Sequence, residues 1–129
     1  MPQEAGSVMP KVLIVDDSQS ALYVLRKLVE RAGHQAVTAE SGEQALRLAA
    51  EEMPEVILMD IVMPGMSGYT ATRQLHRSNS TQHIPVIFVS SKSGEADRDW
   101  GLRQGARDYV TKPINPDALL TAISAAIAA

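Results

Sequence analysis

The sequence contains no cysteine, which excludes disulfide bonds and thiolate metal sites and fits a reducing compartment. It also lacks a long apolar run, because none of its hydrophobic stretches approaches the about 20 residues that a membrane-spanning helix needs. Residues 1–9 carry Glu4 and show no basic segment followed by an apolar one, so they do not form a signal peptide. These absences predict a cytoplasmic protein with no membrane insertion.

Basic clusters are missing as well. The chain has 12 Lys and Arg against 15 Asp and Glu, a net charge of −3, and its basic residues are scattered along the sequence. Binding to nucleic acid depends on neutralising many phosphates with clustered Lys and Arg. No nucleic-acid partner is therefore expected.

The length of 129 residues suits one domain, and a hydrophobic content of 45% is typical of a globular protein. Pro10 follows a second methionine, Met9, and precedes the first apolar run. We expect residues 1–10 to be a flexible N-terminal leader and residues 11–129 to form the domain.

Short apolar runs alternate with longer amphipathic segments throughout the domain. Five strands are predicted, at residues 12–15, 35–39, 56–59, 85–89 and 108–111. Five helices are predicted after them: from Ser18 to Gly33, from Ser41 to Pro54, over 69–77, over 95–104, and from Asn115 to the end. Continuous apolar strands alternating with helices indicate the α/β class, with a parallel sheet covered on both faces.

Polar and charged side chains follow four of the five predicted strands. They are three carboxylates, two hydroxyls and one ammonium group: Asp16 and Asp17, Asp60, Ser90 and Ser91, and Lys112. Ligands of open α/β sheets bind beyond the carboxyl ends of the strands. The sequence therefore predicts a binding site at this edge.

Carboxylates that lie close together repel one another, by roughly 4 kcal/mol per pair at an effective dielectric constant near 20. A hard divalent cation with oxygen ligands relieves that repulsion, and Mg²⁺ typically combines one or two carboxylates with water and phosphate oxygens. Lys112 adds a positive charge that favours an arriving anion. Such a site suits the transfer of a phosphoryl group to a carboxylate.

The chain closely resembles the receiver domains of response regulators. Four segments carry the resemblance: residues 12–18 (VLIVDDS), 57–68 (ILMDIVMPGMSG), 85–91 (PVIFVSS) and 105–113 (GARDYVTKP). The resemblance implies a flavodoxin-like (βα)5 fold, doubly wound, with strand order 2-1-3-4-5. It implies that Asp60 accepts a phosphoryl group from the phosphohistidine of a histidine kinase.

The resemblance also implies a metal site. Asp17 and Asp60 would ligate Mg²⁺ directly, Asp16 would act through water, and the backbone carbonyl of Val62 would complete the protein ligands. Mn²⁺ is expected to substitute for Mg²⁺.

Further roles follow from the same resemblance. Lys112, before a cis peptide bond to Pro113, would contact the phosphoryl group, Ser90 would move to hydrogen-bond it, and Ser91 would offer its backbone N–H. Tyr109 matches the switch aromatic of the family, and a buried rotamer is expected when Ser90 has moved inward. The alternative for Tyr109 is an ordinary half-buried strand aromatic.

Two positions are expected to tune how long the phosphoryl group lasts. Val62 and Lys92 flank the path of a hydrolytic water, and the Val62 side chain has no polar atom with which to orient that water. We expect self-phosphorylation and slow to moderate self-dephosphorylation, but no other enzymatic activity.

Residues 97–109 resemble the single-domain regulators of type IV pilus twitching motility, which work beside a chemotaxis-like histidine kinase. The expected output surface comprises the fourth helix, the fifth strand and the fifth helix. Within it, Trp100 either contributes to a partner surface or simply packs the fourth helix.

Several functions remain open at this point. With no residues left for an output domain, a stand-alone regulator would act by docking on a motility protein or by draining phosphoryl groups from a shared kinase. A small Mg²⁺-dependent phosphatase with an aspartate nucleophile is an alternative, but such enzymes usually carry an acid two positions later, where this chain has Val62. A receiver-like protein that binds partners without phosphorylation is the third possibility.

Overall fold

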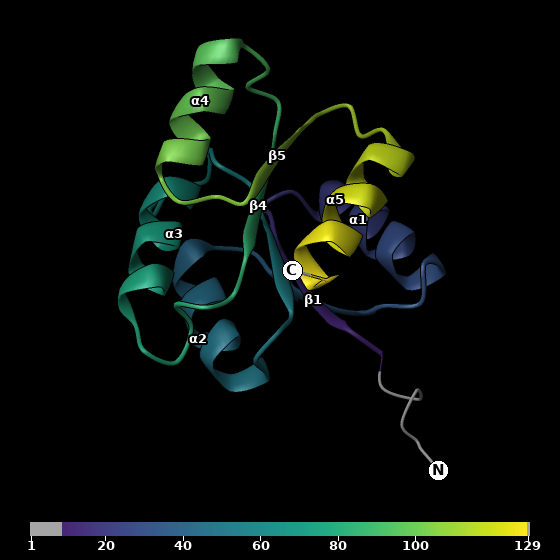
Figure 1. Cartoon of the computed structure of the whole chain (residues 1–129), viewed down its shortest axis with the longest axis horizontal. Helices are drawn as coiled ribbons and strands as arrows, with labels where there is room; N and C mark the ends of the chain where they lie inside the picture. The colour runs from purple at the N-terminus through teal and green to yellow at the C-terminus, as the bar shows by residue number, and fades with distance from the viewer. Residues whose placement is uncertain (1–8, 129) are drawn as a thin grey trace.

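The computed structural model describes residues 9–128 and contains one five-stranded sheet (Figure 1). Most of the predicted leader, residues 1–8, lies outside the described part. The strands are β1 (Lys11–Val15), β2 (Gln35–Ala39), β3 (Val56–Met59), β4 (Val86–Ser90) and β5 (Asp108–Thr111). All neighbouring strands are parallel and follow the order β2-β1-β3-β4-β5, which confirms the predicted topology.

Five helices connect and cover the strands. They are α1 (Gln19–Arg31), α2 (Gly42–Glu52), α3 (Gly68–Arg77), α4 (Glu95–Arg103) and α5 (Pro116–Ala128). Figure 1 shows α1 and α5 on one face of the sheet and α2, α3 and α4 on the other. Among the described residues, no helix is both long enough and apolar enough to span a bilayer.

The alternation of side chains along each strand divides the core into two layers. On β1, Val12 and Ile14 pack with the apolar faces of α1 and α5, whereas Leu13 and Val15 pack with α2 and α3. All four side chains are at most 1% exposed. Burial on both faces explains why the strands are continuously apolar rather than alternating.

Side-chain caps start four of the helices, at the predicted residues Ser18, Ser41 and Asn115 and at Ser67, for which no cap is predicted. Ser18, Ser41 and Ser67 each accept a hydrogen bond from a backbone N–H of the first turn, and Asn115 does the same for α5. The predicted capping box of α2 is shifted by one residue, because the Gln44 side chain accepts from the N–H of Glu40 rather than that of Ser41.

The predicted boundary of β4 is wrong by one residue at each end. The strand begins at Val86, because Pro85 has no N–H to donate, although its carbonyl accepts from Ile57 at 3.0 Å. The strand ends at Ser90, whose carbonyl accepts from Lys112 at 2.8 Å. Ser90 is therefore held by the sheet itself, at the edge where the candidate site lies. The third and fourth helices also differ by one residue, beginning at Gly68 and ending at Arg103.

Candidate functional site

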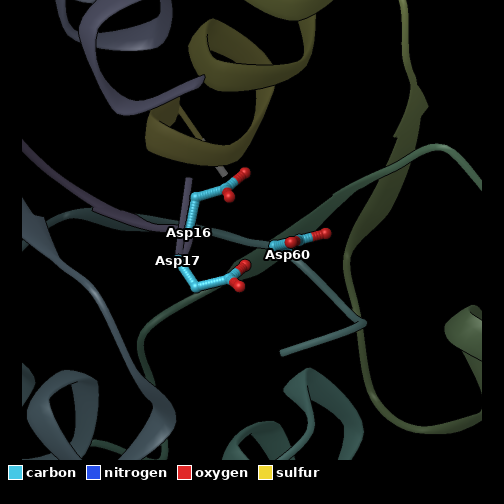
Figure 2. A group of neighbouring side chains, drawn as sticks. All are labelled: Asp16, Asp17 and Asp60. Carbon is cyan, nitrogen blue, oxygen red and sulfur yellow. The ribbon is translucent and has the colours of Figure 1, made fainter. Parts of the chain in front are cut away.

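Three aspartates meet where β1 and β3 end. The two strands are adjacent and in register, with Val15 opposite Met59, so the residues that follow them emerge side by side. Asp16, Asp17 and Asp60 each offer a carboxylate oxygen, and these oxygens lie within 4.8 Å of one another. Figure 2 shows all three carboxylates projecting to the same side of the strand ends. The structure thus brings together the acidic residues that the sequence singles out.

The three carboxylates differ in their surroundings. Asp16 is 1% exposed and Asp60 is 8% exposed, whereas Asp17 is open to solvent. The Oδ1 of Asp16 accepts from the N–H of Ser18 at 2.9 Å, and the Oδ1 of Asp60 accepts from the N–H of Ile61 at 2.9 Å. Neither bond is enough to solvate a buried charge fully, so each buried carboxylate still needs a cationic partner.

Lys112 supplies part of that positive charge. Its ammonium donates to the Oδ2 of Asp16 at 2.9 Å and lies 3.9 Å from the Oδ1 of Asp60. The peptide bond from Lys112 to Pro113 is cis. Lys112 therefore bonds the more deeply buried aspartate while remaining close to Asp60, where it can also attract an anion.

Burial and the neighbouring carboxylates disfavour the ionised form of Asp60 more than Lys112 stabilises it. The pKa of its carboxyl is raised to about 6, first by burial and second by repulsion from Asp16, while Lys112 acts in the opposite direction. At pH 7 Asp60 is thus largely ionised but unfavourably placed. A cation bound to a carboxylate oxygen of Asp60, or an electrophile bonded to it, would reduce the electrostatic repulsion among the three close carboxylates.

A hydroxyl pair lies on the β4 side of the site. The Oγ of Ser90 accepts from the N–H of Lys92 at 3.1 Å, and the hydroxyl of Tyr109 donates to the carbonyl of Lys92 at 2.6 Å. Tyr109 is 2% exposed, and its burial raises the pKa of its hydroxyl. The Tyr109 ring therefore points into the core, and Ser90 and Tyr109 each make a hydrogen bond to the backbone of Lys92.

Comparison with known proteins identifies the family. The sequence matches the response regulator receiver domain over residues 12–124, nearly the whole chain. The chain belongs to the receiver-domain family of response regulators. Protein PilH of Pseudomonas aeruginosa is 51% identical over 120 residues, which are 93% of this chain and 99% of PilH.

Solved receiver structures share the whole fold. A putative response regulator from Chloroflexus aurantiacus superposes with a TM-score of 0.90 at 27% identity, over 95% of this chain and 100% of that one. The receiver domain of the Pseudomonas aeruginosa sensor histidine kinase PA1611, solved with a magnesium ion coordinated in its active-site cleft, gives 0.87 at 26% identity, over 95% of this chain and 100% of that chain. As a receiver domain, this chain is of the kind that takes a phosphoryl group from a histidine kinase.

Three further residues singled out in the sequence follow Asp60 or Ser90 closely in the chain and lie at the surface. Val62 is 62% exposed, and Ser91 and Lys92 are also exposed. All three are accessible to solvent and to a docking protein.

Gly68 contacts the backbone of the site, although the sequence pattern assigns it no role there. Its N–H donates to the carbonyl of Ile61 at 2.9 Å, and a Cβ at this position would collide with the carbonyl oxygen of Asp60. The start of α3 therefore packs directly against the backbone of Asp60. The second glycine of the loop, just after the capping Ser67, was the available signal.

Proposed function

We propose that this receiver domain is a stand-alone two-component response regulator whose phosphoacceptor is Asp60. The observation that carries the proposal is the position of this carboxylate: it is buried, within 4.8 Å of two others, 3.9 Å from Lys112, and destabilised in its ionised form. The match over 99% of PilH supports a protein that works without an output domain on the same chain.

Asp60 would react as the nucleophile. One of its oxygens forms a bond to phosphorus as the P–N bond of the phosphohistidine breaks, and the electron pair of that bond returns to the imidazole. Lys112 would then contact the phosphoryl oxygens, the hydroxyl of Ser90 would leave the N–H of Lys92 to donate to them, and Ser91 would offer its backbone N–H. The proximity of Lys112 to Asp60 supports this set of roles.

The donor set at the site fits Mg²⁺, since it consists of hard carboxylate oxygens at the ends of two adjacent strands. Asp17 and Asp60 would ligate the ion directly, Asp16 would act through water, and the carbonyl of Val62 would be the remaining protein ligand, with Mn²⁺ an acceptable substitute. When bound, the ion supplies positive charge to the carboxylates and to the transferring group. The magnesium-containing receiver of PA1611 supports this assignment.

Two further assignments concern timing and switching. The exposed, apolar side chain of Val62 would leave the hydrolytic water without a dedicated positioning group, which favours slow to moderate self-dephosphorylation, and Lys92 would be the second position that tunes this rate. Tyr109 would report the state of Ser90, since both side chains bond the backbone of Lys92.

The output would pass through the surface formed by α4, β5 and α5, toward a motility protein controlled by a chemotaxis-like kinase. Trp100 and Leu102 on α4 are 51% and 40% exposed, which supports docking there, while the Trp100 ring also packs edge to face on Tyr69 of α3 with centroids 6.5 Å apart. The identity to PilH, together with the resemblance of residues 97–109 to twitching-motility regulators, supports this pathway. A role as a phosphate sink predicts instead that no motility protein prefers the phosphorylated form.

Intact mass after incubation with acetyl phosphate and Mg²⁺ tests the central assignment. We expect one phosphoryl adduct in the wild type and none in Asp60→Ala or after chelation of the metal. An adduct that persists in Asp60→Ala, or a wild type that never gains one, would overturn the assignment. Steady turnover of a small phosphoester would instead support the phosphatase alternative, which the apolar Val62 disfavours.

A pulldown separates docking from a phosphate sink. Beryllofluoride-treated protein is expected to recover a motility protein that the untreated protein does not. Equal recovery in both states would favour the sink.

A further inference from the structure

Helix α4 is attached to the sheet through little buried side-chain surface. Gly101 is its one buried residue, while its bulky neighbours Trp100 and Leu102 are 51% and 40% exposed. The residue that precedes the helix at its N-cap, Gly94, has no side chain to cap it, in contrast to the serine caps of α1, α2 and α3. Three kinds of contact therefore hold α4: the close packing at Gly101, the polar contacts of the helix, and the edge-to-face contact of the Trp100 ring with Tyr69 of α3, whose centroids are 6.5 Å apart.

The Tyr109 ring lies directly beneath Gly101. A Cβ at position 101 would be 2.8 Å from Cδ2 and 2.9 Å from Cε2 of Tyr109, and 3.1 Å from Cδ2 of Phe88. Carbon atoms in a packed interior are ordinarily about 3.5–4.0 Å apart. Phe88 and Tyr109 also pack edge to face, with centroids 6.3 Å apart, so the ring has little room to shift while it stays inward.

Tyr109 is tied to the phosphoacceptor site through its hydroxyl. That hydroxyl donates to the carbonyl of Lys92, and the N–H of Lys92 donates to the Oγ of Ser90. On the other side, Arg98 of α4 donates from Nη1 to the carbonyl of Tyr109 at 3.0 Å. The position of the ring, the position of α4 and the hydroxyl of Ser90 are thus connected by three hydrogen bonds.

We propose that Gly101 is a positioning residue for the switch: α4 admits the inward Tyr109 ring because position 101 carries no side chain. A side chain there turns the ring outward, breaks its bond to Lys92 and weakens binding of a phosphoryl group at Asp60. The position of the ring stands on the geometry alone, whereas the effect on Asp60 rests on the proposed function.

A glycine in a helix interior weakens that helix relative to alanine, so Gly101 disfavours α4 unless it has a packing role. The inward ring provides one, since Tyr109 occupies the space that a methyl group would fill. Without the ring, alanine should be the better residue at this position. Substitutions at positions 101 and 109 are therefore expected to be strongly coupled in their effect on stability.

Nitration of tyrosines with tetranitromethane, read by peptide mass, measures the position of the ring in the unphosphorylated protein. Tyr23 is 56% exposed and serves as an internal reference, whereas the buried Tyr109 should react slowly. In Gly101→Ala we expect the rate at Tyr109 to rise about tenfold relative to Tyr23, the scale of a core overpacking penalty. An unchanged relative rate would mean that α4 moves instead of the ring, and would overturn the proposal.

Urea unfolding in two backgrounds distinguishes a steric role from a general loss of folding. Gly101→Ala should lower the unfolding midpoint when Tyr109 is present and raise it in the Tyr109→Ala background, where the methyl group no longer meets the ring. The same shift in both backgrounds would contradict the coupling.

Calorimetric titration with beryllofluoride and Mg²⁺ tests the link to Asp60. We expect Gly101→Ala to bind about tenfold more weakly than the wild type, since binding then has to restore the inward ring. Equal affinities would overturn the link even if the ring has turned outward. A wild type that binds no beryllofluoride would overturn the proposed function and the link together, while the nitration result would still decide the position of the ring.

Discussion

Replacing Asp60 with asparagine should stabilise the metal-free protein. The ionised carboxyl of Asp60 is disfavoured in the folded state, because its pKa is raised from 3.8 to about 6 by burial and by repulsion from Asp16. Asparagine has the same shape, keeps an oxygen to accept from the N–H of Ile61, and carries no charge. The variant should therefore lose the unfavourable charge without losing the local backbone bond.

The magnitude follows from the pKa values of Asp60 in the folded and unfolded states. A rise of about two pKa units at 1.36 kcal/mol each corresponds to a cost of about 3 kcal/mol at pH 7.5. Because the folded pKa is the higher one, the cost appears as the pH rises above 3.8 and levels off above about 6. By the same linkage it falls to about 1.6 kcal/mol at pH 5 and about 0.6 kcal/mol at pH 4.

Urea unfolding with a chelator present measures this cost. We expect the free energy of unfolding of Asp60→Asn to exceed that of the wild type by about 2–3 kcal/mol at pH 7.5 and by less than about 1 kcal/mol at pH 4. Asp17→Asn is the matched control, since it removes an exposed charge from the same cluster and should stabilise less. Millimolar Mg²⁺ should reduce the difference in free energy of unfolding between Asp60→Asn and the wild type, because the ion stabilises only the wild type of these two proteins.

The reasoning would be refuted by either of two results. One is an Asp60→Asn variant that is less stable than the wild type at pH 7.5 without metal. The other is a difference between the two proteins that does not shrink as the pH falls from 7.5 to 4.

Three further predictions concern residues around Asp60. Val62→Asn should change the free energy of unfolding by no more than about 0.5 kcal/mol, because the Val62 side chain is 62% exposed. The same variant should lose the phosphoryl adduct several-fold faster in a timed mass measurement. An unchanged rate of loss would count against the role of Val62. Lys112→Met should lower the free energy of unfolding by about 2 kcal/mol in metal-free urea titrations, because the buried Asp16 loses its partner at 2.9 Å. Adding Mg²⁺ should restore part of the lost free energy of unfolding. A metal-free variant as stable as the wild type would contradict the pairing of Lys112 with Asp16. Gly68→Ala should cost about 1–3 kcal/mol and reduce adduct formation, because its methyl group meets the backbone of Asp60, which cannot turn aside; unaltered phosphorylation would show that the start of α3 can move without disturbing the site.

The amino-acid sequence determined the elements of this protein and the edge at which its chemistry gathers. Apolar runs of strand length alternate with capped amphipathic helices, and this pattern by itself requires a parallel sheet with helices on both faces. Because each polar cluster directly follows a strand, the parallel arrangement brings Asp16, Asp17 and Asp60 together. These features are local in the chain, which is why periodicity and spacing were enough to predict them.

The tertiary structure decided how the site residues are paired and strained. Lys112 lies 2.9 Å from Asp16, the more deeply buried carboxylate, and 3.9 Å from Asp60, and both the pairing and the burial depend on what the rest of the fold places around these residues. The raised pKa of Asp60 has the same origin. Gly68 and Gly101 show most clearly what the sequence alone does not predict. A side chain at position 68 would collide with the backbone oxygen of Asp60, and one at position 101 would collide with the Tyr109 ring. Those contacts exist only after segments distant in the sequence have packed together.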